Sequence, residues 1–410
     1  MKGQTWWLLC LWGWMILGSA CAPTVAKSGP IVVSRPEYSW PDEFMLVQPD
    51  GVMGSGIVYN MGNGRHMATF PPGRLAADKQ HYVAASRQAQ STSVDMFNLE
   101  EAKADSRFTL DGQWQLAGLS PNGRWLAFTN AAEKSKVGSA YTEMAVVAAE
   151  DGQIVHTVAL EGHFEVDALS NDGAGLFLIQ YVPADQPEHY VVRFYDLRSE
   201  ALHPDVLRDK RSNDEVMTGY AWGTVADGQG QWWNTLYVST QRNKAFIHAL
   251  NLQEHLFTIC IDLPSGDGDF ETLQQYSLSL SPNGRTIYAT NPALGLVAEV
   301  SLETYELVRQ VTFEKVAHKS AENVSSSIVS PDGSWLFFTN GHQVWAYDTV
   351  AKVVKDGPYL AQSAVSIQGL AVSGDGARLV VALAEGPLQL FDILSGEVLA
   401  FAGGEVAERP

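Results

Sequence analysis

The stretch Leu278–Asn291, LSLSPNGRTIYATN, decides the fold of this chain. Alternating apolar and small polar residues run into Ser281-Pro282-Asn283-Gly284, and a second β-rich run, Ile287 to Thr290, follows at once. Two such runs joined by a turn of Pro, Asn and Gly are typical of a tight β-hairpin. The sequence therefore predicts two antiparallel strands that meet at residues 281–284.

The same hairpin pattern occurs in seven places along the chain. Each copy is a short apolar run, a polar turn and a second run of aliphatic or aromatic residues. The copies are Leu75-Ala76-Ala77-Asp78 before Tyr82–Ala85, Leu119–Gly123 before Leu126–Asn130, Leu169–Gly173 before Leu176–Leu178, Val225–Gly228 before Leu236–Val238, the opening stretch, Val329–Gly333 before Leu336–Asn340, and Val372–Gly376 before Leu379–Val381.

A second register supports the repeat. Each copy is followed by an apolar run, a polar turn and another apolar run, as at Phe194-Tyr195-Asp196-Leu197-Arg198 and Leu390–Gly396. Both registers step by about 43–56 residues, close to the roughly 40–50 residues of a propeller blade. A four-stranded sheet cannot bury both of its faces alone, so the sheets must pack around a central axis. The sequence predicts an all-β fold, a β-propeller.

The number of blades is the open point. Gly56–Asn60, a Gly-Asn-Gly turn and His66–Phe70 form one more pair of outer strands before the first copy. This N-terminal pair completes the ring beside the last blade or supplies part of another blade. We expect seven four-stranded blades, with eight as the alternative.

The repeats resemble the YVTN-type and WD-repeat-like bacterial β-propellers, from about Phe44 to Gly404. The shared feature is Ser-Pro-Asp/Asn-Gly followed by a run that ends in Thr-Asn, as at Thr129-Asn130, Thr290-Asn291 and Thr339-Asn340. Relatives in that superfamily include lactonases, propeller subunits of amine dehydrogenases and interaction scaffolds. The resemblance implies the fold and does not choose among these functions.

The composition excludes some classes of partner. The 410 residues include 46 Asp and Glu against 27 Lys and Arg, for a net charge of -19. Binding to nucleic acid or to an anionic membrane surface needs basic patches, so neither is expected. We expect a monomeric propeller.

The N-terminus predicts export. Lys2 precedes an unbroken apolar and small-residue run from Trp6 to Ala20, which is typical of a signal peptide and short for a membrane span. Gly18-Ser19-Ala20-Cys21 resembles a bacterial lipoprotein signal, which implies a lipid on Cys21 and anchoring in the cell envelope. An ordinary cleaved signal or an uncleaved anchor is the alternative. The predicted division is a signal at 1–20, a tether at 21–42 and one propeller domain at 43–410.

A candidate binding site comes from two copies that align without a gap and then differ. Gln113 and Gln115 in the earlier copy correspond to His163 and Glu165 in the later one. There, Glu161, His163, Glu165 and Asp167 occupy every second position and share one face of a strand if the segment is extended. Carboxylates around a histidine at the mouth of the central channel could bind a divalent cation or act as an acid/base pair. The alternative is a polar, water-facing strand edge.

A second candidate is the loop Pro264–Glu271. It places Asp267, Asp269 and Glu271 at alternate positions among glycines, like the front of a calcium loop, but the later bidentate Glu of that motif is missing. A solvated connection between blades is the alternative. Cys260 and the tryptophans, among them Trp114, Trp222, Trp232 and Trp233, are expected in the core.

No catalytic signature occurs in the sequence, since it has no His-Glu-x-x-His, Gly-x-Ser-x-Gly or phosphate-binding glycine loop. The leading hypothesis is a non-catalytic, envelope-anchored propeller that binds a protein or another surface ligand. A lactonase-like or other hydrolase at the channel mouth is the second hypothesis, with a divalent cation such as calcium as its possible cofactor. The third is the propeller subunit of a redox complex, with the cofactor on a partner.

Overall fold

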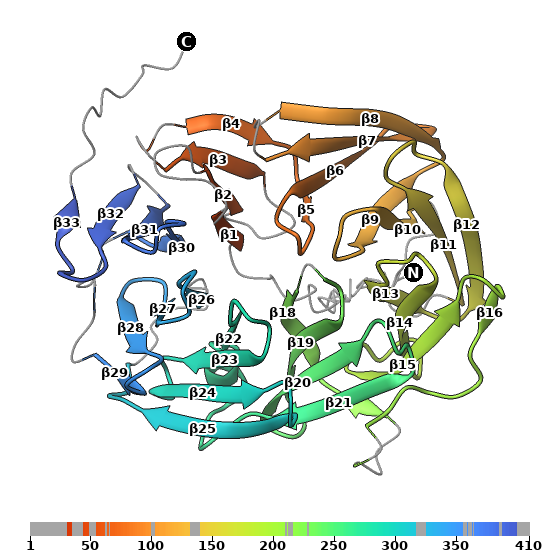
Figure 1. Cartoon of the computed structure of the whole chain (residues 1–410). Coiled ribbons are helices and arrows are strands. Elements are labelled where there is room, and N and C mark those ends of the chain that lie inside the picture. The colour runs from red at the N-terminus through yellow and green to blue at the C-terminus, as the bar shows by residue number, and fades with distance from the viewer. Residues whose placement is uncertain are drawn as a thin grey trace, which may run out of the picture.

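The computed structural model describes residues 31–34, 44–48, 55–61, 64, 66–99, 103–131, 140–209, 211, 216–227, 229–316, 325–355, 359, 363, 365–384 and 388–399. Within these ranges, eight antiparallel sheets form a ring, so the chain is a β-propeller of eight blades (Figure 1). We name the blades A to H in chain order. The eight-blade alternative is therefore confirmed over the preferred seven.

The first four blades cover residues 31–218. Blade A contains β1 (Ile31–Ser34), β2 (Phe44–Gln48), β3 (Gly56–Asn60) and β4 (His66–Phe70). Blade B contains β5 (Gly73–Leu75), β6 (His81–Arg87), β7 (Ser91–Asn98) and β8 (Lys103–Asp111). Blade C contains β9 (Trp114–Leu119), β10 (Trp125–Asn130), β11 (Tyr141–Ala148) and β12 (Ile154–Glu161). Blade D contains β13 (Phe164–Leu169), β14 (Gly175–Tyr181), β15 (His189–Asp196), β16 (Ala201–Leu202) and the additional β17 (Met217–Thr218).

The last four blades complete the ring. Blade E contains β18 (Tyr220–Ala226), β19 (Trp232–Ser239), β20 (Lys244–Asn251) and β21 (Phe257–Asp262), and a short helix, α1 (Phe270–Leu273), follows it. Blade F contains β22 (Ser277–Leu280), β23 (Thr286–Asn291), β24 (Leu296–Ser301) and β25 (Glu306–Thr312). Blade G contains β26 (Ser326–Val329), β27 (Trp335–Thr339), β28 (Val344–Asp348) and β29 (Val353–Val354). Blade H contains β30 (Ile367–Val372), β31 (Arg378–Leu383), β32 (Gln389–Asp392) and β33 (Val398–Leu399).

The first strand of each blade lies toward the middle of the ring and the last strand lies at its rim (Figure 1). The middle strands are buried on both faces because each blade lies between two others, as in β27, where Leu336 to Thr339 are all buried. At the rim, β25 is almost entirely exposed. The apolar core accordingly divides into eight clusters, one between each pair of neighbouring blades. Burying one Leu or Phe side chain in such a cluster contributes about 2 kcal/mol.

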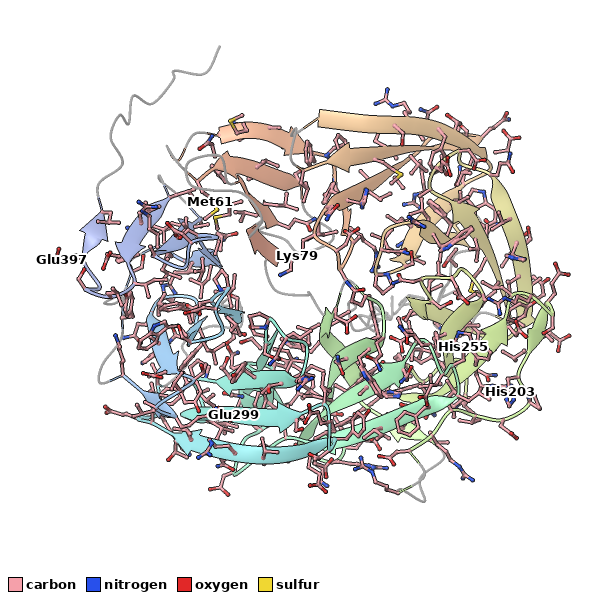
Figure 2. The ribbon with its side chains drawn as sticks, in the orientation of Figure 1. Met61, Lys79, His203, His255, Glu299 and Glu397 are labelled. Atoms are coloured by element: carbon pink, nitrogen blue, oxygen red, sulfur yellow. The ribbon has the colours of Figure 1, made fainter. Side chains whose placement is uncertain are left out.

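Blade A consists wholly of N-terminal strands, and blade H wholly of C-terminal ones. The ring closes without a shared sheet, through side chains such as Met45, Val47 and Met61 against Ala371 and Val380. Met61 is labelled in Figure 2. The N-terminal pair of strands both supplies part of an eighth blade and lies beside the last one. β1 falls within the range expected to be a tether, and it pairs with β2 as the innermost strand.

The repeated turn has a physical basis. In the opening stretch, the Ser281 hydroxyl donates to Oδ1 of Asn283 at 2.7 Å and accepts from the Thr286 amide at 2.9 Å. Asn283 Oδ1 also accepts from the Arg285 amide, and Gly284 adopts φ 69°, where glycine is favoured. The same network recurs at Ser120, Ser170, Ser330 and Ser373.

The copy in blade B departs from this pattern. Ala76 replaces the serine, and Lys79 takes the position of the glycine with φ 61°. Asp78 still accepts from the Gln80 amide at 2.9 Å, so the turn forms without the serine. Lys79 lies beside the middle of the ring (Figure 2), with an exposed side chain.

These turns also connect neighbouring blades. The Asp78 amide donates to the Pro121 carbonyl, the Asn122 amide to Oδ1 of Asn171, and the Asn171 side chain to the Gln229 carbonyl, each at 2.9 Å. The ends of blades B to E are thereby linked in sequence. We call this end of the ring the turn face and the opposite end, which carries the Glu161–Phe164 and Tyr181–His189 connections, the loop face.

Candidate binding site on blade D

The predicted site residues do not share one strand face, so that expectation is corrected. Glu161 ends β12 at the rim of blade C, whereas Glu165 and Asp167 lie on β13, the innermost strand of blade D. The chain changes blades at Gly162, whose φ of 108° breaks the extended course. Thr142 holds this step, because its hydroxyl donates to the Gly162 carbonyl at 2.8 Å and accepts from the Phe164 amide at 3.1 Å. Glu161 is exposed and apart from the other three.

His163 is buried rather than open to solvent. Its side chain is 1% exposed, and its ring packs on Tyr181 with the centroids 4.7 Å apart. Nδ1 lies 3.4 Å from the Ala184 carbonyl. Nε2 has no hydrogen-bond partner among the described residues and lies 3.9 Å from Oε1 of Glu165. The imidazole is therefore held by packing, with one nitrogen directed at a carboxylate beyond hydrogen-bond distance.

Glu165 is the partly exposed neighbour of this buried histidine. Its side chain is 38% exposed, and its Oε2 accepts a 2.8 Å hydrogen bond from the Tyr181 hydroxyl. Burial and the neighbouring carboxylate raise the pKa of Tyr181 strongly, so the phenol remains a donor at neutral pH. Glu165 is consequently held by Tyr181 through one oxygen, while its other oxygen lies near His163 and its side chain stays partly exposed.

Asp167 occupies a β-bulge. The pairing of β13 with β14 shifts register between Val166 and Ala168, and Asp167 is the extra residue. Burial raises the pKa of Asp167 to about 7, although a hydrogen bond from the Trp233 side chain opposes the shift. Asp167 is thus close to half ionised at neutral pH, which suits one proton-transfer group.

The surroundings of Asp167 come from blades D and E. Tyr190 and Tyr237 stack there with ring centroids 5.1 Å apart, and Asp167 contributes to the raised pKa of both phenols. A positive charge comes from blade B, where Arg74 on β5 interacts electrostatically with Glu165. Burial lowers the pKa of Arg74, and Glu165 opposes that effect. Blades B, D and E therefore bring together two carboxylates, a buried imidazole, phenols and one guanidinium.

The equivalent positions in blade C carry no such cluster. Gln113 donates from its side chain to the Ala89 carbonyl at 3.0 Å, and Gln115 is exposed on β9. The bulged position corresponding to Asp167 is Ala117, since the β9–β10 register shifts there. The two glutamines thus serve as ordinary polar edge residues.

The predicted calcium loop has another structural role. Asp269 is the N-cap of α1, and its Oδ1 accepts from the Thr272 amide at 2.9 Å and from the Thr272 hydroxyl at 2.7 Å. Glu271 lies in the first turn of that helix, and Asp267 is in the preceding turn. Across the described ranges, no three His, Cys, Asp or Glu side chains are grouped as metal ligands. This holds for the loop and for the blade D cluster alike.

Sequence reasoning found three members of the blade D cluster and missed Arg74, Tyr181 and Trp233. Arg74 lies two residues before the first turn, so an alignment of inner strands would have shown a lone cation at the axis. No sequence signal marked Tyr181 or Trp233 as neighbours of the carboxylates, because they belong to other strands. The tryptophans expected in the core, Trp114, Trp222, Trp232 and Trp233, are buried or half-buried within strands.

The predicted signal, with Cys21, lies outside the described residues. In the ranges that are described, no helix has the length and apolar character needed to cross a membrane.

Comparisons with known proteins identify the fold alone. No protein-family model and no curated protein matches the chain. Among solved structures it is similar to one described as dihydro-heme d1 dehydrogenase NirN in complex with DHE, with a TM-score of 0.56, 12% identity, and coverage of 92% of this chain and 78% of that one. Kuenenia stuttgartiensis hydrazine synthase matches with a TM-score of 0.45, 13% identity, and coverage of 85% of this chain and 99% of the other, which is too weak to support an argument. Since 1412 solved chains match, the fold does not select a function.

Proposed function

We propose that this chain is an envelope-anchored, extracytoplasmic propeller related to the YVTN-type repeats, and that it binds a protein or another surface ligand through the loop face at blade D. The observation that carries this proposal is the cluster of Glu165, Asp167 and His163, where blade D departs from a repeating scaffold. The predicted signal at residues 1–20, followed by Cys21, supports the location.

The chemistry of the cluster favours a ligand that donates hydrogen bonds and carries positive charge. The Glu165 side chain is 38% exposed, and the whole chain is strongly acidic. A basic side chain on a partner would be attracted to this region and could pair with Glu165. Tyr181 would keep the carboxylate in position for that contact.

A hydrolase is less well supported by the described residues. Asp167 has a pKa suited to proton transfer, and the Tyr181 hydroxyl donates to the Glu165 carboxylate beside it. Burial raises the pKa of Tyr181 strongly, however, so this phenol stays protonated and is a poor nucleophile. The redox hypothesis has the fold of the NirN structure in its favour. That hypothesis places the cofactor on a partner, so this chain would supply a docking surface for it. Within the chain, His163 is 1% exposed and is therefore poorly placed as an axial ligand to a tetrapyrrole iron.

Site-specific photocrosslinking in the exporting cell tests the proposal. A photoreactive residue replaces Asp185, which is exposed on the loop face next to the Ala184 carbonyl that contacts His163. The matched control replaces Glu303, which is exposed on the turn face beside Arg285. We expect a discrete crosslinked product at position 185 that Glu165→Gln weakens, and none at position 303. Equal products at both positions, or none at 185, would contradict the proposal.

The location has its own test. Cys21→Ser should release the protein from the membrane fraction if a lipid anchors it. A Cys21→Ser protein that is shortened by cleavage and still stays in the membrane fraction would contradict lipid anchoring. The crosslinking result at position 185 is read independently of this test.

A further inference from the structure

His163 has one ring nitrogen that no described residue satisfies. Its Nδ1 lies 3.4 Å from the Ala184 carbonyl, whereas its Nε2 is buried and has no hydrogen-bond partner within the described ranges. Buried polar atoms without a partner are uncommon in folded proteins, and each one points to a bound water, an ion or a ligand group. The identity of the missing partner follows from the atoms that face Nε2.

The contact with Ala184 assigns the hydrogen on this imidazole. A carbonyl oxygen only accepts hydrogen bonds, so the hydrogen of the neutral ring is on Nδ1 and Nε2 presents a lone pair. If Nε2 also carried a hydrogen, its N–H would face Oε1 of Glu165, and the two atoms would approach to about 2.8 Å. Their separation is 3.9 Å. The neutral ring with an acceptor at Nε2 therefore fits the structure.

Glu165 presents a second acceptor to the same point. The Tyr181 hydroxyl donates to its Oε2 at 2.8 Å, and its Oε1 is the atom that faces Nε2 of His163. Two acceptors that face each other are stabilised by a donor between them. One nitrogen with two N–H bonds can reach both, because two hydrogen bonds of about 2.9 Å span acceptors up to roughly 5.8 Å apart. The separation of 3.9 Å lies within that limit.

The surroundings of this pair favour a compact, positively charged donor. A carboxylate binds an ammonium more strongly than a neutral amide, because the hydrogen bond is charge-assisted. An ammonium is also a compact group with three hydrogens, whereas a guanidinium is a broad planar fork, and only a compact group suits a nitrogen as buried as Nε2. The partly exposed side chain of Glu165 gives the donor a path from solvent. Arg74 opposes the attraction, since its own charge acts on Glu165.

We propose that Nε2 of His163 and Oε1 of Glu165 together bind a primary ammonium group, such as that of a lysine side chain. The ammonium donates one hydrogen bond to the imidazole and one to the carboxylate, while Tyr181 holds the carboxylate through its other oxygen. This inference rests on the function proposed for blade D and names the chemical group that the site recognises there.

Histidine side-chain NMR of the full-length protein in detergent tests the proposal. The probe is n-butylammonium, which has the head group and the apolar stem of a lysine side chain. The His163 signals are identified by their loss in His163→Gln. We expect the hydrogen to be on Nδ1 before the amine is added, and the Nε2 resonance to shift during the titration. Tetramethylammonium has the same charge but no N–H bond, so it should cause no such shift.

Two variants show whether the carboxylate takes part. Glu165→Gln should weaken n-butylammonium binding by about tenfold or more, because a charge-assisted hydrogen bond is lost. The matched control Glu200→Gln removes an exposed carboxylate whose Oε1 also lies 3.9 Å from a histidine nitrogen, Nδ1 of His156, and it should leave the affinity unchanged. Equal melting temperatures confirm that both variants fold.

Four results would overturn the proposal. They are a hydrogen on Nε2 of the unliganded protein, an equal response to tetramethylammonium, an equal loss of affinity in Glu165→Gln and Glu200→Gln, and no shift with n-butylammonium. The last result would assign the position beside Nε2 to water only.

The photocrosslink at position 185 separates this inference from the proposed function. A crosslinked partner without an NMR response would overturn the ammonium assignment and leave the proposed function standing, and an NMR response without a crosslink would do the reverse. When both are present, n-butylammonium added to isolated envelopes should reduce the crosslink if the ammonium belongs to a lysine of the partner. An unchanged crosslink would assign the site to a free amine.

Discussion

Blades C and D share a scaffold and differ at both of its edges. Their turns contain the same network, with Ser120 bonded to Asn122 in one and Ser170 to Asp172 in the other. At the inner edge, the bulged residue is Ala117 in blade C and Asp167 in blade D. At the rim, β12 is one continuous strand, whereas β16 and β17 divide the corresponding edge of blade D. The comparison teaches that the repeat preserves the middle of each blade and leaves its two edges free to diverge.

The glycine in the turn of blade D packs against blade C, so substituting it tests how tightly the two blades are coupled. An ideal Cβ on Gly173 would lie 2.5 Å from the Trp125 ring of blade C, whereas one on Gly284 would meet nothing within 4 Å. Both glycines have positive φ. We expect Gly173→Ala to lower the free energy of unfolding by about 3 kcal/mol and Gly284→Ala by about 1 kcal/mol. Urea denaturation of both variants measures the difference, and equal losses would show that Trp125 does not constrain the turn.

Asp167 is the sharpest difference at the inner edge. Its folded pKa of about 7 lies above the ordinary 3.8, so the folded state binds more protons between those pH values. Its contribution to stability is present below pH 3.8 and is lost as pH rises to about 7. We expect Asp167→Asn to be more stable than wild type at pH 8 by about 2 kcal/mol, and by less at pH 5. Urea denaturation at the two pH values measures this.

His248 gives the opposite sign and so serves as the control. Burial lowers its pKa from 6.5 to about 4, so its contribution is present above pH 6.5 and is lost as pH falls toward 4. His248→Asn should flatten the acid side of the stability profile, whereas Asp167→Asn flattens the neutral side. If Asp167→Asn gave the same gain at pH 5 and pH 8, the raised pKa of Asp167 would be refuted.

The turn network that blades C and D share predicts similar losses of stability when its serine is removed from either blade. Ser120 and Ser170 are buried, and each hydroxyl accepts one backbone amide, from Trp125 at 3.0 Å and from Gly175 at 2.8 Å. Ser120→Ala and Ser170→Ala should each cost about 1 kcal/mol, with the second slightly larger because Asp172 is charged. Thermal unfolding of the two single variants checks this, and a large gap between them would mean that the blades do not share one scaffold.

The smallest expected effect lies on the exposed carboxylate. Glu165→Gln keeps an oxygen that can accept from Tyr181, so stability should change by less than about 1 kcal/mol. The reverse change in blade C, Gln115→Glu, lies on an exposed position and should be neutral in stability. Both variants are measured by thermal unfolding, and a large loss in Glu165→Gln would assign that residue a structural role in place of ligand contact.

The sequence predicted the hairpins well because their turns have local chemistry. A serine, an Asn or Asp and a glycine within four residues satisfy one another and the backbone, so the pattern can be read without knowing the neighbours. The sequence predicted blade A, the additional blade that makes the total eight, only in part. Its inner strands, Ile31–Ser34 and Phe44–Gln48, are joined across residues 35–43, which contain no Ser-Pro-Asp/Asn-Gly turn.

The candidate site was predictable only as far as local spacing determines position. The residues His163, Glu165 and Asp167 were found because they differ from an aligned copy. Their separation from Glu161 depends on the change of blade at Gly162, and the pKa of Asp167 depends on burial between two blades. Contacts between blades join residues far apart in sequence, such as Asp167 and Trp233, and no periodicity records them.

The closure of the ring sets an order of events during synthesis. Because blades A and H share no strand, the face of blade A that carries Met45 and Val47 is covered by Ala371 and Val380, which are made more than three hundred residues later. The first blade to be synthesised is therefore among the last to be finished. Until that end is made, one apolar flank of the nascent chain stays without its partner surface.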